Sequence, residues 1–302
     1  MKFVTFKNGS GQSIGVVNAE ESHLLPLADA YEKMGGENIL PSNMIEAITQ
    51  GEIFYQEAEK AVQWVSENNL DSELYIPLES VELLAPIPRP SKNIFCVGKN
   101  YAEHAIEMGS KDDIPEHIMV FTKTPTTVIA HEQNILAHSE VTEQLDYEGE
   151  LAVIIGRKGK AIKREEALDY VFGYTVLNDV TARDLQAKHK QFFIGKSLDT
   201  TCPMGPWIVH KSAIENPNNL DIKTAVNGEV RQDSNTENFI FPIEEIIAVL
   251  SQGMTLEPGD IIATGTPAGV GKGFKPPRFL KAGDTIEITV EGIGTLRNKV
   301  ES

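Results

Sequence analysis

Two glutamates, Glu148 and Glu150, stand either side of Gly149 in the segment LDYEGELAVIIG, residues 145–156. The apolar run that follows, residues 151–155, predicts a buried strand, and residues i and i+2 of a strand point to the same side. Two like charges on one face near a core repel each other and are poorly solvated, which a hard divalent cation would offset. The alternative is a solvated strand edge with two surface glutamates, and this segment alone does not decide between them.

A third carboxylate, Asp179, ends the segment YTVLND, which predicts another strand. Three carboxylates without clustered cysteines or histidines form an oxygen ligand set, which suits Mg²⁺ or Mn²⁺ and leaves positions open for a substrate. Considered alone, Asp179 is explained more simply as the cap of a short helix in TARDLQ, residues 181–186. The sequence does not prove that the three carboxylates meet.

His104 and Glu107 lie three residues apart in NYAEHAIEMG, residues 100–109. On a helix they would share a face, and a histidine held by a carboxylate is a general base that works near neutral pH. The alternative is a surface ion pair. Gly98 and the polar run 111–116 flank this short helix, a setting that suits a lid over a site.

Lys196 follows the apolar residues of FFIGKSLDTTCPMGP, residues 192–206, and could hold a substrate carboxylate or an enolate oxygen. The alternative is a surface lysine. The segment GTPAGVGK, residues 265–272, resembles a phosphate-binding loop superficially, but it lacks the register of that motif and the helix that should follow. We interpret it as a tight loop whose amides and Thr266 hydroxyl could face an anionic ligand, with a plain connection between strands as the alternative.

The elements around these residues are mostly strands. Residues 1–18 predict a hairpin, and the segment APIPRP, residues 85–90, predicts a linker because its prolines exclude a helix. We therefore expect a small α+β N-terminal domain over residues 1–85 and a catalytic domain over residues 86–302. Helices are predicted at 27–34, 43–50, 55–67, 163–172 and 242–250. No regular alternation of strands and helices follows the linker, which argues against Rossmann and TIM architectures and for a mostly β, barrel-like α+β fold.

The composition limits the function. The chain has 302 residues, 41% of them hydrophobic, and a formal net charge of −17, which argues against nucleic acid or an anionic membrane as a partner. Its two cysteines form neither a disulfide framework nor a zinc spacing. We find no signal peptide and no stretch near the about 18 apolar residues of a membrane span. A cytoplasmic protein without membrane insertion is expected.

Six segments, taken in order, resemble the fumarylacetoacetate hydrolase superfamily. Each is modest alone, but the set in register is specific, and it spans about residues 86–300. The segments are GKNYAEHAIEMG, LDYEGELAVIIG, GYTVLNDVTARDLQ, GKSLDTTCPMGP, VNGEVRQDSNT and GDIIATGTPAGVG. The resemblance implies a β-rich fold of the β-sandwich-roll type, a homodimer, and one Mg²⁺ or Mn²⁺ per subunit.

The resemblance also assigns roles to individual residues. It implies that Glu148, Glu150 and Asp179 hold the metal and that His104 and Glu107 form a catalytic pair on a lid. It further implies Lys196 as the active-site lysine and Gln186 and Thr266 as substrate contacts. Lys99 departs from the pattern, because many members have arginine there, and lysine lacks the bidentate fork of arginine.

A small-molecule 2-oxo acid is the implied substrate, bound to the metal through its carboxylate and 2-oxo oxygen, with enolate charge developing on that oxygen. We expect oxaloacetate decarboxylation or keto–enol tautomerisation. The alternatives are hydrolysis of a C–C bond in acylpyruvates or fumarylpyruvate, and isomerisation of 2-hydroxyhepta-2,4-diene-1,7-dioate. A non-enzymatic scaffold would predict a broken set of site residues, and the set is complete here. A role in partner binding would fall to the N-terminal domain.

Overall fold

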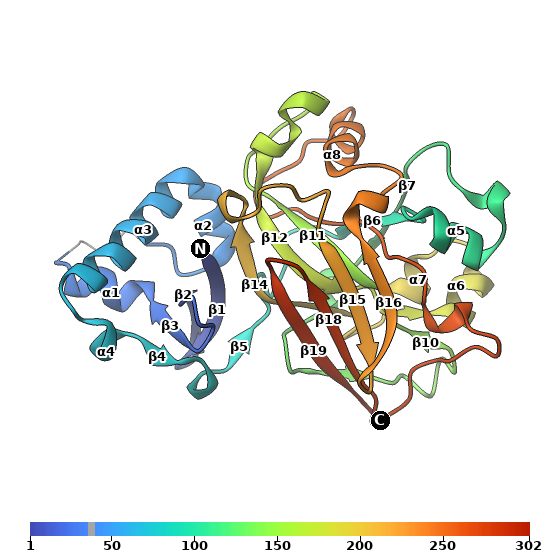
Figure 1. Ribbon diagram of the computed structural model, residues 1–302, viewed down its shortest axis with the longest axis horizontal. Coiled ribbons are helices and arrows are strands. Elements are labelled where there is room, and N and C mark those ends of the chain that lie inside the picture. Colours follow the sequence, from blue (N-terminus) through green and yellow to red (C-terminus); the bar gives the residue numbers. More distant parts are fainter. Residues whose placement is uncertain (36–39) are drawn as a thin grey trace.

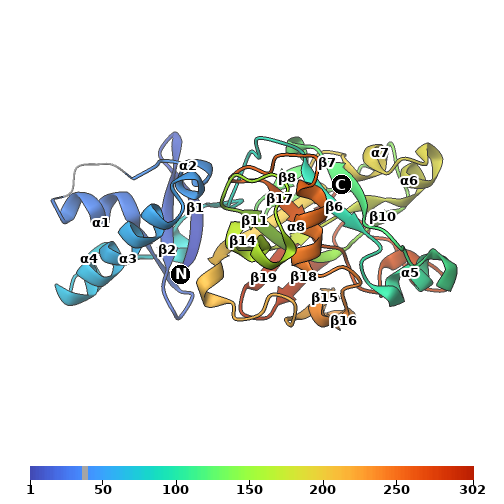
Figure 2. The same ribbon diagram turned by 90° about the horizontal axis from the view of Figure 1, so that it is seen from above.

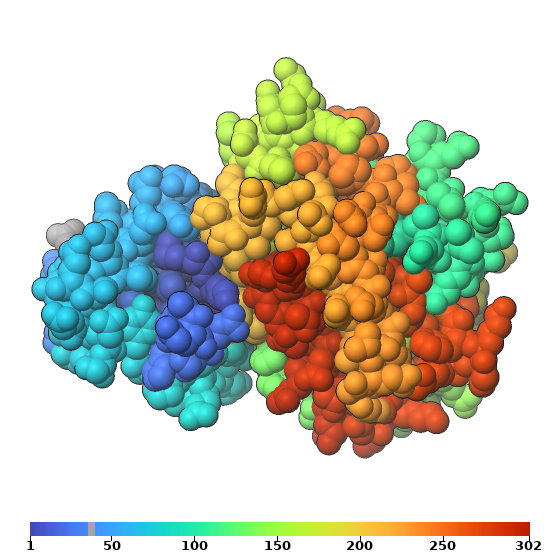
Figure 3. Space-filling model, in the orientation of Figure 1, coloured from blue at the N-terminus to red at the C-terminus, as the bar shows by residue number. Residues whose placement is uncertain are grey.

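A computed structural model describes residues 1–35 and 40–302. Its N-terminal elements form a lobe at one end of the molecule, and the remaining strands form the larger body (Figures 1 and 3). Helices and strands are mixed and strands are the more numerous, so the predicted α+β class is confirmed. None of the described helices combines the length and apolar character needed to cross a membrane.

The N-terminal lobe is a small sheet covered by helices. The predicted hairpin is confirmed, with Asn8 opposite Gly11 across its turn. The third predicted helix begins at Glu52 rather than Tyr55. The strands are β1 (Lys2–Asn8), β2 (Gly11–Val17), β3 (His23–Pro26), β4 (Ile76–Pro77) and β5 (Leu83–Leu84), and the helices are α1 (Leu27–Lys33), α2 (Met44–Gln50), α3 (Glu52–Glu67), α4 (Asp71–Leu74) and the 3₁₀ turn η1 (Leu78–Ser80).

The body of the molecule contains the remaining strands, listed here in chain order. They are β6 (Ile94–Gly98), β7 (Met119–Lys123), β8 (Val128–Ile129), β9 (Asn134–Leu136), β10 (Leu145–Asp146), β11 (Gly149–Ile155), β12 (Val171–Asn178), β13 (Thr181–Ala182), β14 (Cys202–His210), β15 (Asp221–Val226), β16 (Glu229–Asn235), β17 (Ile261–Ala263), β18 (Thr285–Val290) and β19 (Gly294–Glu301).

Short helices connect these strands. The α-helices are α5 (Ala102–Met108), α6 (Arg183–His189), α7 (Phe193–Lys196) and α8 (Ile243–Ser251). The 3₁₀ turns are η2 (Lys111–Asp113), η3 (Pro125–Thr127), η4 (Arg164–Tyr170), η5 (Lys211–Ala213), η6 (Thr236–Asn238) and η7 (Gly271–Gly273). Helices α5, α6 and α7 lie at the end of the molecule opposite the N-terminal lobe (Figure 2).

Two large sheets make up the core. Among the described residues, twelve strands belong to one sheet, whose main path runs β4-β3-β2-β1-β14-β12-β11-β17-β6-β7, and five form a second sheet in the order β16-β15-β18-β19-β9. The long path has two ends, so this sheet is open rather than a closed barrel. Strand β11 is buried along its whole length, because its consecutive residues Leu151 and Ala152 point to opposite faces and belong to different apolar clusters. This explains why its sequence is an unbroken apolar run.

The helix predicted over residues 163–172 is wrong at its end. The chain forms a 3₁₀ turn only to Tyr170, and strand β12 begins at Val171. Val171 pairs with Ile155 of β11, so pairing with the neighbouring strand prevails over the local helical pattern.

The sheet continues from the N-terminal lobe into the body. Strand β1 pairs antiparallel with β14, with Lys2 opposite Val209 and Phe3 opposite Ile208. The Thr5 hydroxyl donates to the Pro86 carbonyl at 2.6 Å, which holds the proline-rich segment against β1. The lobe and the body therefore share backbone hydrogen bonds, and a domain boundary near residue 85 stays a prediction.

His210, at the end of β14, joins the two parts through its ring. The ring stacks on Tyr55 of α3 with centroids 4.0 Å apart and meets Phe172 edge-on. Burial, with smaller contributions from the charges of the N-terminal amine of Met1 and of Lys211, lowers the pKa of His210 to about 4. The imidazole is therefore neutral in the folded protein at neutral pH.

This histidine should make the protein less stable in mild acid. Between pH 6.5 and about 4 the unfolded chain binds a proton that folded His210 does not, so the free energy of unfolding falls as the pH falls. We expect a loss of about 1–2 kcal/mol between pH 7 and pH 5, measured by urea denaturation. The variant His210→Gln should lose less over the same interval. An equal loss in the variant would show that other groups are responsible.

Candidate active site

The antiparallel pairing of β11 and β12 brings three carboxylates together. Gly149 pairs with Asn178, and the Asp179 N–H donates to the Glu148 carbonyl at 2.9 Å. Glu148 lies just before β11 and Glu150 lies within it, so the strand begins two residues before the predicted apolar run of 151–155. One carboxylate oxygen from each of Glu148, Glu150 and Asp179 lies within 4.8 Å of the other two, and all three residues are buried.

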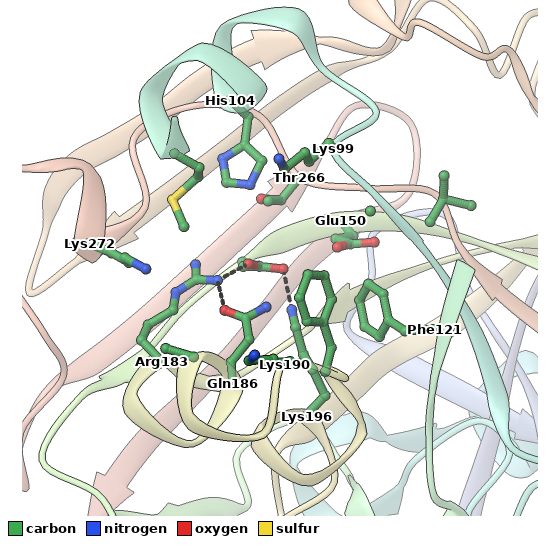
Figure 4. A pocket seen from close by; sticks show the side chains of 16 residues that line it. Lys99, His104, Phe121, Glu150, Arg183, Gln186, Lys190, Lys196, Thr266 and Lys272 are labelled. Carbon is green, nitrogen blue, oxygen red and sulfur yellow. Dashed lines mark hydrogen bonds and ion pairs between the residues drawn. The ribbon is translucent and has the colours of Figure 1, made fainter. Parts of the chain in front are cut away.

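Buried cations surround two of the carboxylates. The Lys196 ammonium lies 2.7 Å from both Glu148 Oε2 and Asp179 Oδ2. Arg183 Nη1 lies 2.7 Å from Glu148 Oε1, and Lys123 Nζ lies 2.8 Å from Asp179 Oδ1. Figure 4 shows Arg183 and Lys196 reaching the cluster from the same side, where α6 and α7 lie. Glu148 and Asp179 are therefore neutralised within the protein.

Glu150 is the exception. Its carboxylate accepts one hydrogen bond, from the Gly265 N–H at 2.7 Å, and no described residue forms an ion pair with it. Burial raises the pKa of Glu150 well above its usual value, and the charges of Asp179 and Glu148 raise it further. Burial would also raise the pKa of Glu148, but the ammonium of Lys196 and the guanidinium of Arg183 hold it well below its usual value.

The cluster therefore has the properties of a divalent-cation site. Its donors are all carboxylate oxygens, the set that hard cations such as Mg²⁺ and Mn²⁺ prefer. The uncompensated carboxylate of Glu150 supplies the negative charge that such a cation would balance. The residues present fit the predicted metal.

The packing around position 149 leaves no room for a side chain larger than that of glycine. Its N–H donates to Gln232 Oε1 at 3.0 Å, and a Cβ at this position would collide with the Thr224 hydroxyl and press on Ile288. Thr224 and Ile288 belong to β15 and β18 of the second sheet. The close approach of that sheet, which the sequence does not reveal, explains why glycine separates the two glutamates.

Helix α5 places His104 above the pocket, and Glu107 faces it. Their nearest atoms, His104 Nδ1 and Glu107 Oε2, lie 3.4 Å apart. The Glu107 carboxylate also accepts the Gly269 N–H at 2.9 Å and 3.2 Å, and a Cβ on Gly273 would collide with it. The predicted pair thus exists, and Glu107 also fastens α5 to the loop that carries Thr266.

The predicted substrate contacts all line the same pocket. Gln186 Oε1 accepts a hydrogen bond from Arg183 at 3.3 Å, and the Thr266 hydroxyl accepts one from Gln232 at 2.7 Å. Lys99 lies at the edge of the pocket, but its ammonium is 3.1 Å from Asp113, so it also ties η2 in place. The pocket has a volume of about 380 Å³, and its lining includes Lys99, His104, Glu148, Gln186, Lys196 and Thr266 (Figure 4).

Three buried charged residues around the carboxylate cluster were missed by sequence reasoning. Lys123 and Arg183 are buried beside the carboxylates, and Asp146 accepts a hydrogen bond from Arg183 Nε at 2.8 Å. Arg183 could have been proposed from the sequence as a neighbour of the cluster, because it follows the predicted ligand Asp179 by only four residues. Lys123 ends an ordinary strand pattern, and its burial follows only from the packing of β7.

Comparison with known proteins supports the resemblance. The family model described as fumarylacetoacetate (FAA) hydrolase C-terminal matches residues 93–301. The chain is 55% identical over 302 residues to the oxaloacetate tautomerase YisK of Bacillus subtilis, covering 99% of this chain and 100% of that protein.

Two solved structures are similar to this chain in both sequence and fold. A fumarylacetoacetate hydrolase from Exiguobacterium antarcticum is 41% identical, with 100% of this chain and 99% of that chain covered and a TM-score of 0.83. A maleylpyruvate hydrolase from Sphingobium is 30% identical, with the same coverage and a TM-score of 0.77.

Proposed function

Because this chain belongs to the fumarylacetoacetate hydrolase family, we propose that it is a divalent-cation-dependent enzyme that acts on 2-oxo dicarboxylic acids, with oxaloacetate as the substrate. We favour keto–enol tautomerisation, decarboxylation, or both. The observation that carries the proposal is the buried cluster of Glu148, Glu150 and Asp179, with Glu150 uncompensated, at the base of a pocket lined by cations. The full-length similarity to an oxaloacetate tautomerase supports the substrate.

In this proposal Glu148, Glu150 and Asp179 hold Mg²⁺ or Mn²⁺. When bound, the cation would act as a Lewis acid that stabilises negative charge on the substrate's 2-oxo oxygen. Lys196 already lies against two of the three carboxylates, so its ammonium adds a second positive charge beside that oxygen. Gln186 and Thr266 orient the substrate through hydrogen bonds, and Lys99 fixes the edge of the pocket.

His104 would move the proton. In tautomerisation it would take a proton from C3 of the keto form and deliver it to the 2-oxo oxygen, which gives the enol, and in the reverse direction it would return the proton from that oxygen to C3. Glu107 orients the imidazole and stabilises its protonated form. Helix α5 also covers the pocket, which excludes water from the reacting carbon.

The alternative is hydrolysis of a C–C bond, and the similarity to a maleylpyruvate hydrolase favours it. His104 would then activate a water molecule against the distal carbonyl of an acylpyruvate, and the enolate of pyruvate would leave. Isomerisation of 2-hydroxyhepta-2,4-diene-1,7-dioate needs only proton transfer at the same site. The present residues permit each reaction.

The decisive assay uses purified protein with Mg²⁺ or Mn²⁺ and three substrates: oxaloacetate, acetylpyruvate and fumarylpyruvate. We expect tautomerisation or decarboxylation of oxaloacetate well above the rate with free cation alone. Turnover of the acylpyruvates with none of oxaloacetate would reject the first choice in favour of the hydrolase.

Three further features belong to the proposal. We propose a homodimer and a cytoplasmic location, both from the family resemblance and the composition. We also propose that residues 1–85 act as a distinct domain, although its sheet joins that of the body through β1 and β14.

A further inference from the structure

The pocket contains more positive charge than its carboxylates neutralise. Five cationic side chains line it, in a chain whose formal net charge is −17. Three of them are paired: Lys196 and Arg183 with the carboxylate cluster, and Lys99 with Asp113. The ammonium groups of Lys190 and Lys272 have no hydrogen-bond or ion-pair partner among the described residues. Such unpaired cations at a pocket are suited to an anionic group of the substrate.

Hydrogen bonds to the buried carboxylate of Asp146 hold the backbone of Lys272 in place. The Asp146 carboxylate accepts the N–H groups of Gly271 at 2.7 Å and of Lys272 at 3.1 Å, and it also accepts Arg183 Nε at 2.8 Å. One buried carboxylate therefore positions both Lys272 and Arg183. Lys190, by contrast, follows the last residue of α6 with a φ of 60°, and nothing comparable anchors it. Lys272 is the better placed of the two.

Arg183 has an unused hydrogen-bond donor on the Lys272 side of the pocket. Its side chain is 2% exposed, and its Nη2 is buried without any hydrogen-bond partner among the described residues. A buried donor without a partner is costly, which points to a ligand that satisfies it. Lys272 and Arg183 line the same pocket, and both are hydrogen-bonded to Asp146, so the two cations lie on the same side of the site. In Figure 4 the Lys272 ammonium lies on the Arg183 side of the pocket, away from Glu150.

We propose that Lys272, together with Nη2 of Arg183, binds the far carboxylate of a 2-oxo dicarboxylic acid and thereby favours tautomerisation over loss of that carboxylate. This inference rests on the proposed function. It divides the pocket into an end that holds the 2-oxo acid group, at Glu148, Glu150 and Asp179, and an end that holds the second carboxylate.

The effect on the outcome follows from where charge moves. In decarboxylation the bond between C3 and C4 breaks, its electron pair passes into the enolate, and neutral CO₂ leaves, so the negative charge moves away from Lys272. A cation that holds the C4 carboxylate stabilises the substrate more than this transition state and raises the barrier. In tautomerisation a proton moves between C3 and the 2-oxo oxygen, and the C4 carboxylate keeps its charge throughout. The same cation then contributes binding without opposing the reaction.

The test compares oxaloacetate with its 4-monomethyl ester, which lacks the far charge. For Lys272→Met we expect the KM for oxaloacetate tautomerisation to rise about tenfold, with kcat little changed and the KM for the ester unaffected. The ratio of decarboxylation to tautomerisation should rise by several fold. Lys272→Arg should restore both quantities in part. Lys275→Met removes the same charge from an exposed position that does not line the pocket, and it should behave as wild type.

Two results would overturn the role of Lys272. One is an unchanged KM and product ratio in Lys272→Met, and the other is an equal loss for oxaloacetate and its ester, which would indicate a general disturbance of the pocket. Inhibition by oxalate, which has no far carboxylate, should be unchanged in the variant and reports that the other end is intact. If wild type does not turn over oxaloacetate, the proposed function fails. The affinities of diacid and ester, measured by displacement of oxalate, then still decide whether Lys272 distinguishes them.

Discussion

Glu150→Gln is expected to reduce turnover of oxaloacetate by about 100- to 10,000-fold in the presence of Mg²⁺, since a Lewis acid contributes several kcal/mol to such reactions. Glutamine keeps the shape of the side chain and can still accept the hydrogen bond from Gly265, but it removes the charge that the cation would balance. Steady-state kinetics and calorimetric titration with Mg²⁺ would measure the two losses.

The stability of the metal-free variant separates a ligand from a structural residue. Glu150 is buried beside two other carboxylates and has no cationic partner among the described residues, so its removal should leave the metal-free melting temperature unchanged or higher. Glu148→Gln is a poorer probe, because it would remove one of the two carboxylate partners of both Arg183 and Lys196. Glu140→Gln, at an exposed position, is the matched control. A variant that binds Mg²⁺ and works like wild type would contradict the assignment of Glu150.

Lys196→Met is expected to destabilise the metal-free protein by about 3–5 kcal/mol, because it removes a buried cation that bridges Glu148 and Asp179. It should also lower turnover by at least about 100-fold, through the loss of positive charge beside the developing enolate. Denaturant unfolding without metal, together with steady-state kinetics, measures both effects.

Added Mg²⁺ should stabilise this variant more than it stabilises wild type, because the cation then neutralises carboxylates that Lys196 neutralises in the intact protein. Lys188→Met, on the exposed surface of α6, controls for the loss of a lysine and should change neither quantity. Equal stabilisation of Lys196→Met and wild type by Mg²⁺ would mean that the lysine and the cation do not neutralise the same carboxylates.

Local patterns were sufficient for the parts of the fold that depend on neighbouring residues. The hairpin of β1 and β2 follows from alternation and an asparagine–glycine turn, and the apolar run of β11 correctly predicts a buried strand. The pairing of β1 with β14 joins residues about two hundred positions apart, which no local pattern specifies. The end of the helix predicted over 163–172 failed for the same reason, since β11 determines where β12 begins.

The candidate site shows a similar division. The carboxylates, the pair of His104 and Glu107, and Lys196 were predicted from residue types and from the family resemblance. The structure places Glu148, Glu150, His104 and Lys196 around one pocket, with Asp179 in the carboxylate cluster and Glu107 beside His104. The neutralisation of Glu148 and Asp179 was not predicted, because it depends on Lys123 and Arg183 being folded into the core. The spacing of residues in the sequence also could not show that Glu150 is the one carboxylate of the three without a cationic partner among the described residues.

The most direct test of the account is a crystal structure with Mn²⁺ and oxalate, a mimic of the pyruvate enolate. The account predicts an anomalous difference peak bound by Glu148, Glu150 and Asp179, with oxalate completing the coordination beneath His104. A peak elsewhere, or oxalate bound in the pocket without any metal at saturating Mn²⁺, would contradict it.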